Sequence, residues 1–413
     1  MLASARALVD AGILTVADVE GRYRAMRETV MTEAQATVDA LRSGASSRIA
    51  TADAVMDPLT AYRPSAVAAT ASSLHGEPDG QRLTLAGMIN RTLTDIMAAR
   101  PDVLVFGEDV AVKGGVYGVT KGLRKRFGAA RVFDTLLDEQ TVLGTALGTA
   151  LAGFVPIPEI QYLAYLHNAE DQLRGEAASL KFFSDGQFSN GMVVRIAGLA
   201  YQRGFGGHFH NDNAVAVLRD IPGIVVAVPS SASEAAALLR TCVALAVEEG
   251  RVCVFLEPIA LYHRVDLEDG DGALRCVDTT SAEFGTVATH LDGDELAIVT
   301  FGNGVVMSRR AASRLRQRGI GVTVVDLRWI VPLPVDDLLS RLEGFGRVLI
   351  ADETRHDGGV GEGVVTALVE GGYDGAIRRV SSANSFVPLG AAADLVLLSE
   401  DEIVAAAAHM IDL

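Results

Sequence analysis

Apolar residues near the amino terminus recur at steps of three and four, the period of one face of a helix. Thr15 followed by Asp18 matches a helix start, and Gly44 marks the end of the pattern. The apolar stripe consists of Val19, Tyr23, Met26, Val30, Ala34, Val38 and Leu41. Because one amphipathic helix cannot bury its own stripe, we expect it to dock on another surface; a flexible leader is the alternative.

The residues that follow this helix are small, polar and interrupted by prolines, which predicts an extended linker. Residues 1–80 are therefore predicted to be a helical arm and linker.

Beyond residue 80 the pattern changes to short apolar runs separated by helix-length stretches. Strands are predicted at 103–107, 156–161, 192–197, 224–229 and 252–258, and helices at 84–97, 139–153, 168–183 and 232–248. Alternating strands and helices predict a mostly parallel sheet covered on both faces, which we assign to residues 81–275. Ligands of such sheets bind at the carboxyl ends of the strands.

The carboxyl-terminal part of the chain repeats this arrangement on a smaller scale. Strands are predicted at 295–302, 321–328 and 347–353, with helices between them. A charged, turn-rich link separates this part from the preceding one. The predicted fold is α/β, with two successive parallel-sheet domains, 81–275 and 276–413, behind the helical arm.

Composition narrows the range of functions. With 49% hydrophobic and 21% charged residues, the 413-residue chain can build large cores. Its net charge of −16 argues against nucleic acid as a partner, because phosphate binding needs clustered Lys and Arg. The nearest approach to a membrane span, 142–158, is rich in Gly and Thr and ends in prolines, which favours a buried helix and a strand. Three cysteines without a CxxC pair, and no signal-peptide pattern, predict a reducing cytoplasm.

Glu139 is the first candidate for chemistry. It opens a helical stretch in which Gly144, Gly148 and Ala152 stand four apart, a spacing that lets two helices touch along their backbones. A Glu at a helix start is ordinarily a cap that interacts with the helix dipole. A lone acid at the mouth of a tightly packed element can instead be a buried proton donor or acceptor. The residues alone leave both interpretations open.

Two histidines form the second candidate. In extended backbone His208 and His210 would face the same side, and Asp212 could orient an imidazole or raise its pKa. The same residues could ligate zinc, although no further His or Cys cluster accompanies them.

Several segments occur in the order found in one enzyme family. They are FGEDV (106–110), GGVYGVTKGL (114–123), RVFDTLLDE (131–139), EIQYLAY (159–165), GGHFH (206–210), FLEPIALYHR (255–264), DLRWIVPLP (326–334) and GGVGEG (358–363). From about residue 82 onward the chain resembles the beta subunit of the thiamine-diphosphate-dependent 2-oxo acid dehydrogenase decarboxylase component (pyruvate and branched-chain type, transketolase-like superfamily). The resemblance implies a pyrimidine-binding domain followed by a transketolase C-terminal-like domain. The arm at 1–80 is similar to the carboxyl-terminal end of the family's alpha subunit.

The resemblance also implies roles for four residues. Glu139 would hydrogen-bond the pyrimidine nitrogen of thiamine diphosphate and favour the imino form of its amino group. Tyr165 would pack on the pyrimidine ring with Gln161 beside it, although an aromatic residue in a strand more often belongs to the core. His210 would assist decarboxylation and acyl transfer.

Two features depart from the family pattern. The family usually has Ser-Gln after the histidine, whereas this chain has Asn211 and Asp212, which puts the usual substrate in doubt. Gly270-Asp271-Gly272 has the letters of the thiamine-diphosphate metal motif, but it falls in the charged link and predicts a turn. We therefore assign no metal ligand to this chain.

Without a diphosphate and magnesium motif, the chain is expected to need a partner. The resemblance implies an α2β2 assembly in which an alpha subunit holds the diphosphate through magnesium and this chain holds the pyrimidine. The expected reaction is decarboxylation of a 2-oxo acid and transfer of the acyl unit to the lipoyl group of an acyltransferase, or to a carrier protein. Two alternatives stay open. One is a split transketolase-like or acyloin-forming enzyme that transfers a two-carbon unit to an aldehyde or carrier protein, and the other is a non-catalytic scaffold subunit.

Overall fold

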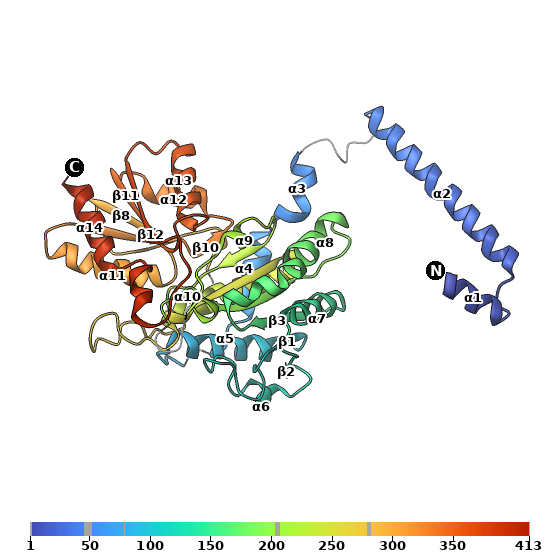
Figure 1. Cartoon of the computed structure of the whole chain (residues 1–413), viewed down its shortest axis with the longest axis horizontal. Coiled ribbons are helices and arrows are strands. Elements are labelled where there is room, and N and C mark those ends of the chain that lie inside the picture. The colour runs from blue at the N-terminus through green and yellow to red at the C-terminus, as the bar shows by residue number, and fades with distance from the viewer. Residues whose placement is uncertain (1, 45–51, 78, 203–206, 279–281, 413) are drawn as a thin grey trace. The chain divides into compact units, whose positions relative to one another are not determined.

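The computed structural model describes residues 2–44, 52–77, 79–202, 207–278 and 282–412 (Figure 1). The chain divides into two compact units, Met1–Pro58 and Leu59–Leu413. Among the described residues, no helix is both long and apolar enough to cross a membrane.

The first unit is helical. Helix α1 spans Leu2–Asp10 and α2 spans Val16–Arg42. The predicted start of α2 is confirmed as a capping box. The Thr15 hydroxyl accepts a hydrogen bond from the Asp18 N–H at 3.1 Å, and the Asp18 carboxylate accepts one from the Thr15 N–H at 2.9 Å. No residue of α2 is buried, so docking of its apolar stripe stays a prediction.

Helices also form where the sequence predicts an extended linker. Helix α3 spans Ala52–Thr60 and α4 spans Pro64–Ser73, so the prediction is wrong for this part; residues 45–51 lie outside the described residues. Proline at the first position of α4 suits a helix start, and Val67 is buried against α10 (Ala232–Glu249). The small residues of α4 give no clear hydrophobic period, which is why the pattern did not indicate a helix.

Seven strands of the described chain form the first sheet, in the order β10-β5-β6-β4-β3-β1-β2. Neighbouring strands are parallel except β10, which runs antiparallel to β5. The strands are β1 (Val103–Gly107), β2 (Val132–Asp134), β3 (Val155–Ile160), β4 (Met192–Gly198), β5 (Val225–Ala227), β6 (Val252–Pro258) and β10 (Trp329–Val331).

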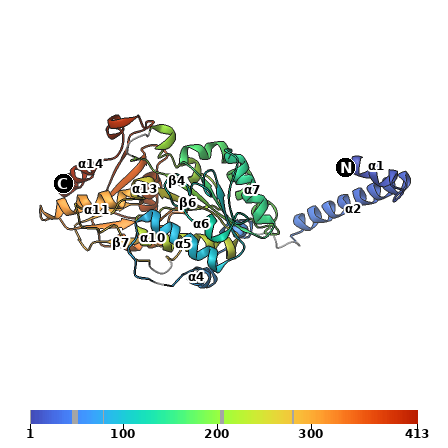
Figure 2. The ribbon, with the colours of Figure 1, turned by 90° about the horizontal axis from the view of Figure 1, so that it is seen from below.

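Helices cover both faces of this sheet (Figure 2). On one face α4, α5 and α10 bury apolar strand residues such as Val105 and Phe255. On the opposite face α7, η2 and η3 pack near Phe106, because successive residues of a strand point to opposite faces. The bounds are Leu85–Ala99 for α5, Leu123–Phe127 for α6, Glu139–Leu151 for α7, Leu163–Ala169 for η2, Gln172–Ala177 for η3 and Ala178–Phe183 for α8.

The second sheet contains five strands among the described residues, in the order β12-β11-β8-β9-β7, with only β7 antiparallel to its neighbour. Its strands are β7 (Ala288–His290), β8 (Leu296–Thr300), β9 (Val322–Asp326), β11 (Arg347–Arg355) and β12 (Ala376–Ser382). Helices α11 (Asn303–Arg316) and α14 (Glu400–Ile411) lie side by side on one face (Figure 1), and α12 (Val335–Leu342) and α13 (Val360–Glu370) contribute to the core of the other.

One apolar cluster continues from the first sheet into the second. It contains Val194 and Val226 of the first sheet together with Val299 and Val325 of the second. The predicted α/β fold with two successive, mostly parallel sheets is therefore confirmed. The exact division at residues 275 and 276 stays a prediction, and β10 lies beyond it in sequence while completing the first sheet.

Glu353, at the carboxyl end of β11, gives a testable pH dependence. Its Oε1 accepts a hydrogen bond from the Gly304 N–H at 3.3 Å, and burial raises its pKa well above the ordinary value. Because the folded chain binds this proton more tightly than the unfolded chain, the stabilising contribution is complete below the unfolded pKa and is lost as pH rises towards the folded pKa. Glu353→Gln is therefore expected to gain stability relative to the native chain as pH increases.

Urea unfolding between pH 5 and pH 8 measures this difference. Glu370→Gln, at an exposed position on α13, is the control and should leave the pH profile unchanged. A pH-independent difference between Glu353→Gln and the native chain would contradict the assignment.

Candidate active site

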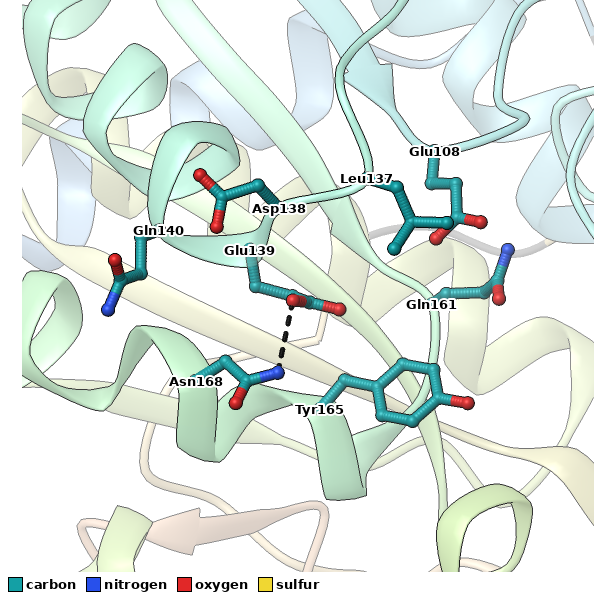
Figure 3. A pocket seen from close by; sticks show the side chains of 8 residues that line it. All are labelled: Glu108, Leu137, Asp138, Glu139, Gln140, Gln161, Tyr165 and Asn168. Atoms are coloured by element: carbon teal, nitrogen blue, oxygen red, sulfur yellow. Dashed lines mark hydrogen bonds between the residues drawn. The ribbon is translucent and has the colours of Figure 1, made fainter.

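A cavity of about 510 Å³ opens at the carboxyl ends of β1 and β3 (Figure 3). This is the edge at which the sequence predicts a ligand site. Three segments build it: the residue after β1, the start of α7, and the turn from β3 into η2. The lining side chains are Glu108, Leu137, Asp138, Glu139, Gln140, Gln161, Tyr165 and Asn168.

Glu139 is not the cap of α7. Asp138 occupies the cap position, and its carboxylate accepts a hydrogen bond from the Thr141 N–H at 3.2 Å. Glu139 is thereby left to face the cavity, where its Oε2 accepts a hydrogen bond from Asn168 Nδ2 at 3.3 Å (Figure 3). Glu139 is half-buried and also stands in the first turn of α7, where its charge suits the helix dipole, so both interpretations of this acid stay open.

Glu108 is a third carboxyl group that lines the cavity, beside Asp138 and Glu139, and it was not among the predicted site residues. Burial raises its pKa, and the neighbouring charges of Asp109 and Glu139 raise it further. The signal was present, since Glu108 directly follows a fully buried strand whose carboxyl end faces the site. Burial and the nearby negative charges thus favour the protonated form of Glu108.

Tyr165 and Gln161 both line the cavity, and their contact with the cofactor stays a prediction; the strand before them ends earlier than expected. Strand β3 stops at Ile160, and Tyr165 lies on the 3-10 helix η2. The predicted strand 156–161 thus ends one residue early, and the placement of Tyr165 in a strand is wrong. Burial raises the pKa of the Tyr165 hydroxyl, and this hydroxyl lies 3.4 Å from Nε2 of His210.

His210 adjoins the cavity through Tyr165. It belongs to the short 3-10 helix η4 (His208–His210), so the expectation of extended backbone at this place is wrong. The Tyr162 ring meets the His210 ring edge-on, with centroids 4.8 Å apart. Asp212 does not orient His210. Its Oδ1 accepts a hydrogen bond from Arg355 at 2.8 Å, and His208 Nδ1 lies 3.9 Å from the same oxygen.

Comparison with known proteins identifies the family. Residues 81–265 match the transketolase pyrimidine-binding domain, and residues 285–403 match the transketolase C-terminal domain. Over 331 residues the chain is 32% identical to the pyruvate dehydrogenase E1 component subunit beta of Staphylococcus aureus (strain N315) and of Staphylococcus epidermidis (strain ATCC 12228 / FDA PCI 1200). Each alignment covers 78% of this chain and 97% of the relative.

The chain belongs to the beta-subunit family of thiamine-diphosphate-dependent 2-oxo acid dehydrogenases.

Solved structures share the fold of this beta-type chain. A split-gene transketolase, described as an inactive beta4 tetramer, superposes with a TM-score of 0.63 at 20% identity, covering 80% of this chain and 99% of that one. A transketolase from Pichia stipitis superposes with a TM-score of 0.59 at 16% identity, covering 82% of this chain and 47% of that one. At these identities the likeness concerns the fold alone.

The cavity of the beta-type chain suits the pyrimidine end of thiamine diphosphate. Its wall offers a carboxylate at Glu139, an aromatic ring at Tyr165 and an amide at Gln161 (Figure 3). No Lys or Arg is among the described residues that line it, so this lining offers no positively charged side chain to pair with a diphosphate. Among the described residues, no group of three or more His, Cys, Asp or Glu side chains could hold a metal ion.

Gly270-Asp271-Gly272 forms a turn, as predicted. The Asp271 carboxylate accepts hydrogen bonds from the backbone N–H groups of Leu267, Glu268 and Ala273 at 3.0, 3.1 and 2.9 Å. The bond from Ala273 contributes most to holding the pKa of Asp271 below its ordinary value. These bonds already engage the oxygens that a metal would need.

A buried ionic cluster lies behind the cavity of the beta-type chain. The Arg195 guanidinium donates to both oxygens of Glu257 at 2.6 and 2.9 Å, and to Glu159 at 2.8 Å. The Tyr262 hydroxyl donates to Glu257 at 2.5 Å. Glu159 and Gln161 are two residues apart at the end of β3, so this cluster supports the strand end that leads into the cavity.

Proposed function

We propose that this chain is the pyrimidine-binding subunit of a 2-oxo acid dehydrogenase, and that Glu139 activates the cofactor. The observation that carries the proposal is that two adjacent acids at the start of α7 have different positions. Asp138 caps the helix, and Glu139 is directed into the cavity beside Asn168. When bound there, thiamine diphosphate would supply the thiazolium carbon that carries charge during cleavage of a 2-oxo acid.

In this proposal each residue of the chain has a defined task. Glu139 holds a proton at the pyrimidine nitrogen, and Tyr165 and Gln161 flank the ring. His210, beside Tyr165, donates or accepts a proton at the substrate. The acyl unit then passes to the lipoyl group of an acyltransferase or to a carrier protein.

A partner subunit is part of the same proposal. The cavity is open and its described lining lacks a cation, so an alpha-type chain would hold the diphosphate and its magnesium ion in an α2β2 assembly. The name of the Staphylococcus relatives, subunit beta of an E1 component, supports this assembly.

Reconstitution tests the proposal. The chain is co-purified with candidate alpha-type chains and screened with pyruvate and branched-chain 2-oxo acids, with thiamine diphosphate and magnesium added and lipoamide as acceptor. We expect cofactor-dependent release of CO2 by a complex only, and weak cofactor binding by the chain alone. Tight binding of thiamine diphosphate by the isolated chain would contradict the divided site.

The exposed glycines of α7 provide a second prediction. Gly144 and Gly148 are exposed, and beyond the adjacent residues and the nearby backbone of α7 a Cβ at either position would meet no atom within 4 Å. If the partner packs on this face, Gly148→Leu should leave the melting temperature of the isolated chain unchanged or slightly higher, because leucine favours helix by about 0.8 kcal/mol. The partner's affinity should fall by at least about tenfold, since the added side chain separates the two backbones.

Analytical ultracentrifugation of the mixed subunits measures that affinity. The matched control is Gln317→Leu, which adds a leucine at an exposed position at the end of α11. Normal assembly of Gly148→Leu would show that this face is not the subunit contact.

A second candidate function is a split transketolase-like or acyloin-forming enzyme. The observation that favours it is the altered pair after His210, because Asp212 is engaged by Arg355 and the surroundings of the histidine differ from those usual in the family. Product analysis with lipoamide and with aldehyde acceptors separates the two candidates. A ketol product with no acyl-lipoamide would favour the second.

A further inference from the structure

The loop at residues 207–213 carries His210 and is held by residues near the end of the second sheet. Residues between 353 and 389 make three contacts with this loop, through backbone or side-chain atoms. Asn213 Nδ2 donates to the Glu353 carbonyl at 3.0 Å. The His208 ring meets the Phe386 ring edge-on at 4.5 Å. A Cβ at Gly207 would come within 2.8 Å of Leu389 Cδ2, so the backbone approaches closely here.

The fourth contact is an ion pair between Asp212 and Arg355. Arg355 Nη2 donates to Asp212 Oδ1 at 2.8 Å, and the Asp212 side chain is only 1% exposed. A buried carboxylate without a partner costs several kcal/mol, so this contact cannot be lost without consequence for the loop. The Ala214 N–H also donates to the same oxygen at 3.3 Å.

Arg355 is itself fixed on two further sides. Its Nε donates to the Ser385 carbonyl at 3.1 Å, and its guanidinium lies over the Phe386 ring at 5.5 Å from the centroid. The arginine therefore joins residues 385 and 386 to the His210 loop. A planar guanidinium suits this position better than a lysine ammonium, because it can stack and donate from different nitrogens at once.

We propose that the Asp212–Arg355 ion pair is a positioning device that holds the 207–213 loop so that His210 stays against Tyr165. The two residues are 143 positions apart, so the second sheet controls a histidine beside the first. The role of this ion pair in catalysis rests on the proposed function, whereas its effect on the position of the loop does not. In the altered sequence after His210, Asp212 thus connects the loop to Arg355, in place of the residues usual in the family.

The loop is tested first in the full-length chain without any partner. Hydrogen–deuterium exchange of peptides covering 207–213, and the rate of His210 carbethoxylation by diethylpyrocarbonate, are measured for Arg355→Met and for Asp212→Asn. The second variant keeps the size of the side chain and serves if the first does not fold. We expect both rates to rise by about tenfold at the loop only, the size of a modest local opening.

The matched control is Arg328→Met. Arg328 Nη2 bonds Glu234 at 2.7 Å with side chains 18% and 15% exposed, and this pair also joins the two halves of the sequence but does not touch the loop. Carbethoxylation of His167, which is half exposed, provides the internal reference. Unchanged loop rates in folded Arg355→Met and Asp212→Asn, or an equal rise at His167, would overturn the proposal.

The reconstituted enzyme supplies a second readout. Arg355→Met should lower kcat by about tenfold with little change in KM, because a displaced catalytic group affects the chemical step, and Arg355→Lys should recover part of the loss. If kcat and KM changed by the same factor in Arg355→Met and in Arg355→Lys, the result would contradict a role of Arg355 in positioning His210. If the native complex shows no turnover, the proposed function fails while the exchange experiment still decides the role of the ion pair.

Discussion

Glu139→Gln is expected to reduce turnover of the reconstituted complex by at least about a hundredfold, the lower range for loss of a general acid–base group. Glutamine has nearly the same shape and can still accept a hydrogen bond from Asn168, which bonds Glu139 at 3.3 Å. It cannot carry the charge that stabilises a proton on the pyrimidine nitrogen. Because Asp138 caps α7, the helix start should remain intact in the variant.

Three measurements separate this effect from misfolding. Circular dichroism and the melting temperature should match the native chain, assembly with the alpha-type partner should be retained, and only the rate should fall. Gln140→Ala removes the neighbouring exposed side chain of the same cavity and should keep turnover within about twofold. If Glu139→Gln retained full turnover, the chain would be a scaffold subunit whose cavity has no part in the chemistry.

Buried strands were predictable from sequence because their apolar runs leave little ambiguity. The predicted runs at 103–107 and 252–258 coincide with β1 and β6, and every residue of both strands is buried. The strands that were missed lie at sheet edges. Strands β2, β7 and β10 have only three residues each, and β12 is partly exposed and contains adjacent arginines. Their pairing depends on neighbours far away in sequence, which a local pattern does not contain.

The site residues show the same limit, because local sequence patterns do not contain contacts between distant segments. Motif order led to Glu139, Gln161 and Tyr165, and the structure brings all three to one cavity. Asn168 was not predicted, because its place in the cavity depends on how η2 meets α7, whereas Glu108 could have been found as the residue after the buried strand β1. The sequence also could not show that Asp138 and not Glu139 caps the helix, since both are acids at adjacent positions.

Arg195→Met is expected to be the most destabilising single substitution considered. Its side chain is 1% exposed and holds two carboxylates, Glu159 and Glu257. Removing the guanidinium leaves both acids buried without their cation, and breaking a buried pair in this way costs about 3–5 kcal/mol. Urea unfolding at pH 7.5 measures the loss. Arg91→Met is the control. Arg91 pairs with Asp79 and Asp95 but is 26% exposed, so the variant should lose no more than about 1 kcal/mol.

The pH dependence of Arg195→Met distinguishes an electrostatic cause from a packing cause. Burial raises the pKa of Glu159 already in the native chain, and the positive charge of Arg195 opposes that rise. Without the arginine the folded pKa should rise further, so the variant should regain stability relative to the native chain as pH falls and lose it as pH rises. Adding Glu159→Gln and Glu257→Gln to Arg195→Met removes both charges and should recover much of the loss, because a neutral buried cluster has no ions to desolvate. A deficit that is the same at pH 5 and pH 8, and that the added substitutions do not reduce, would mean that the cluster stabilises the β3 end through packing alone.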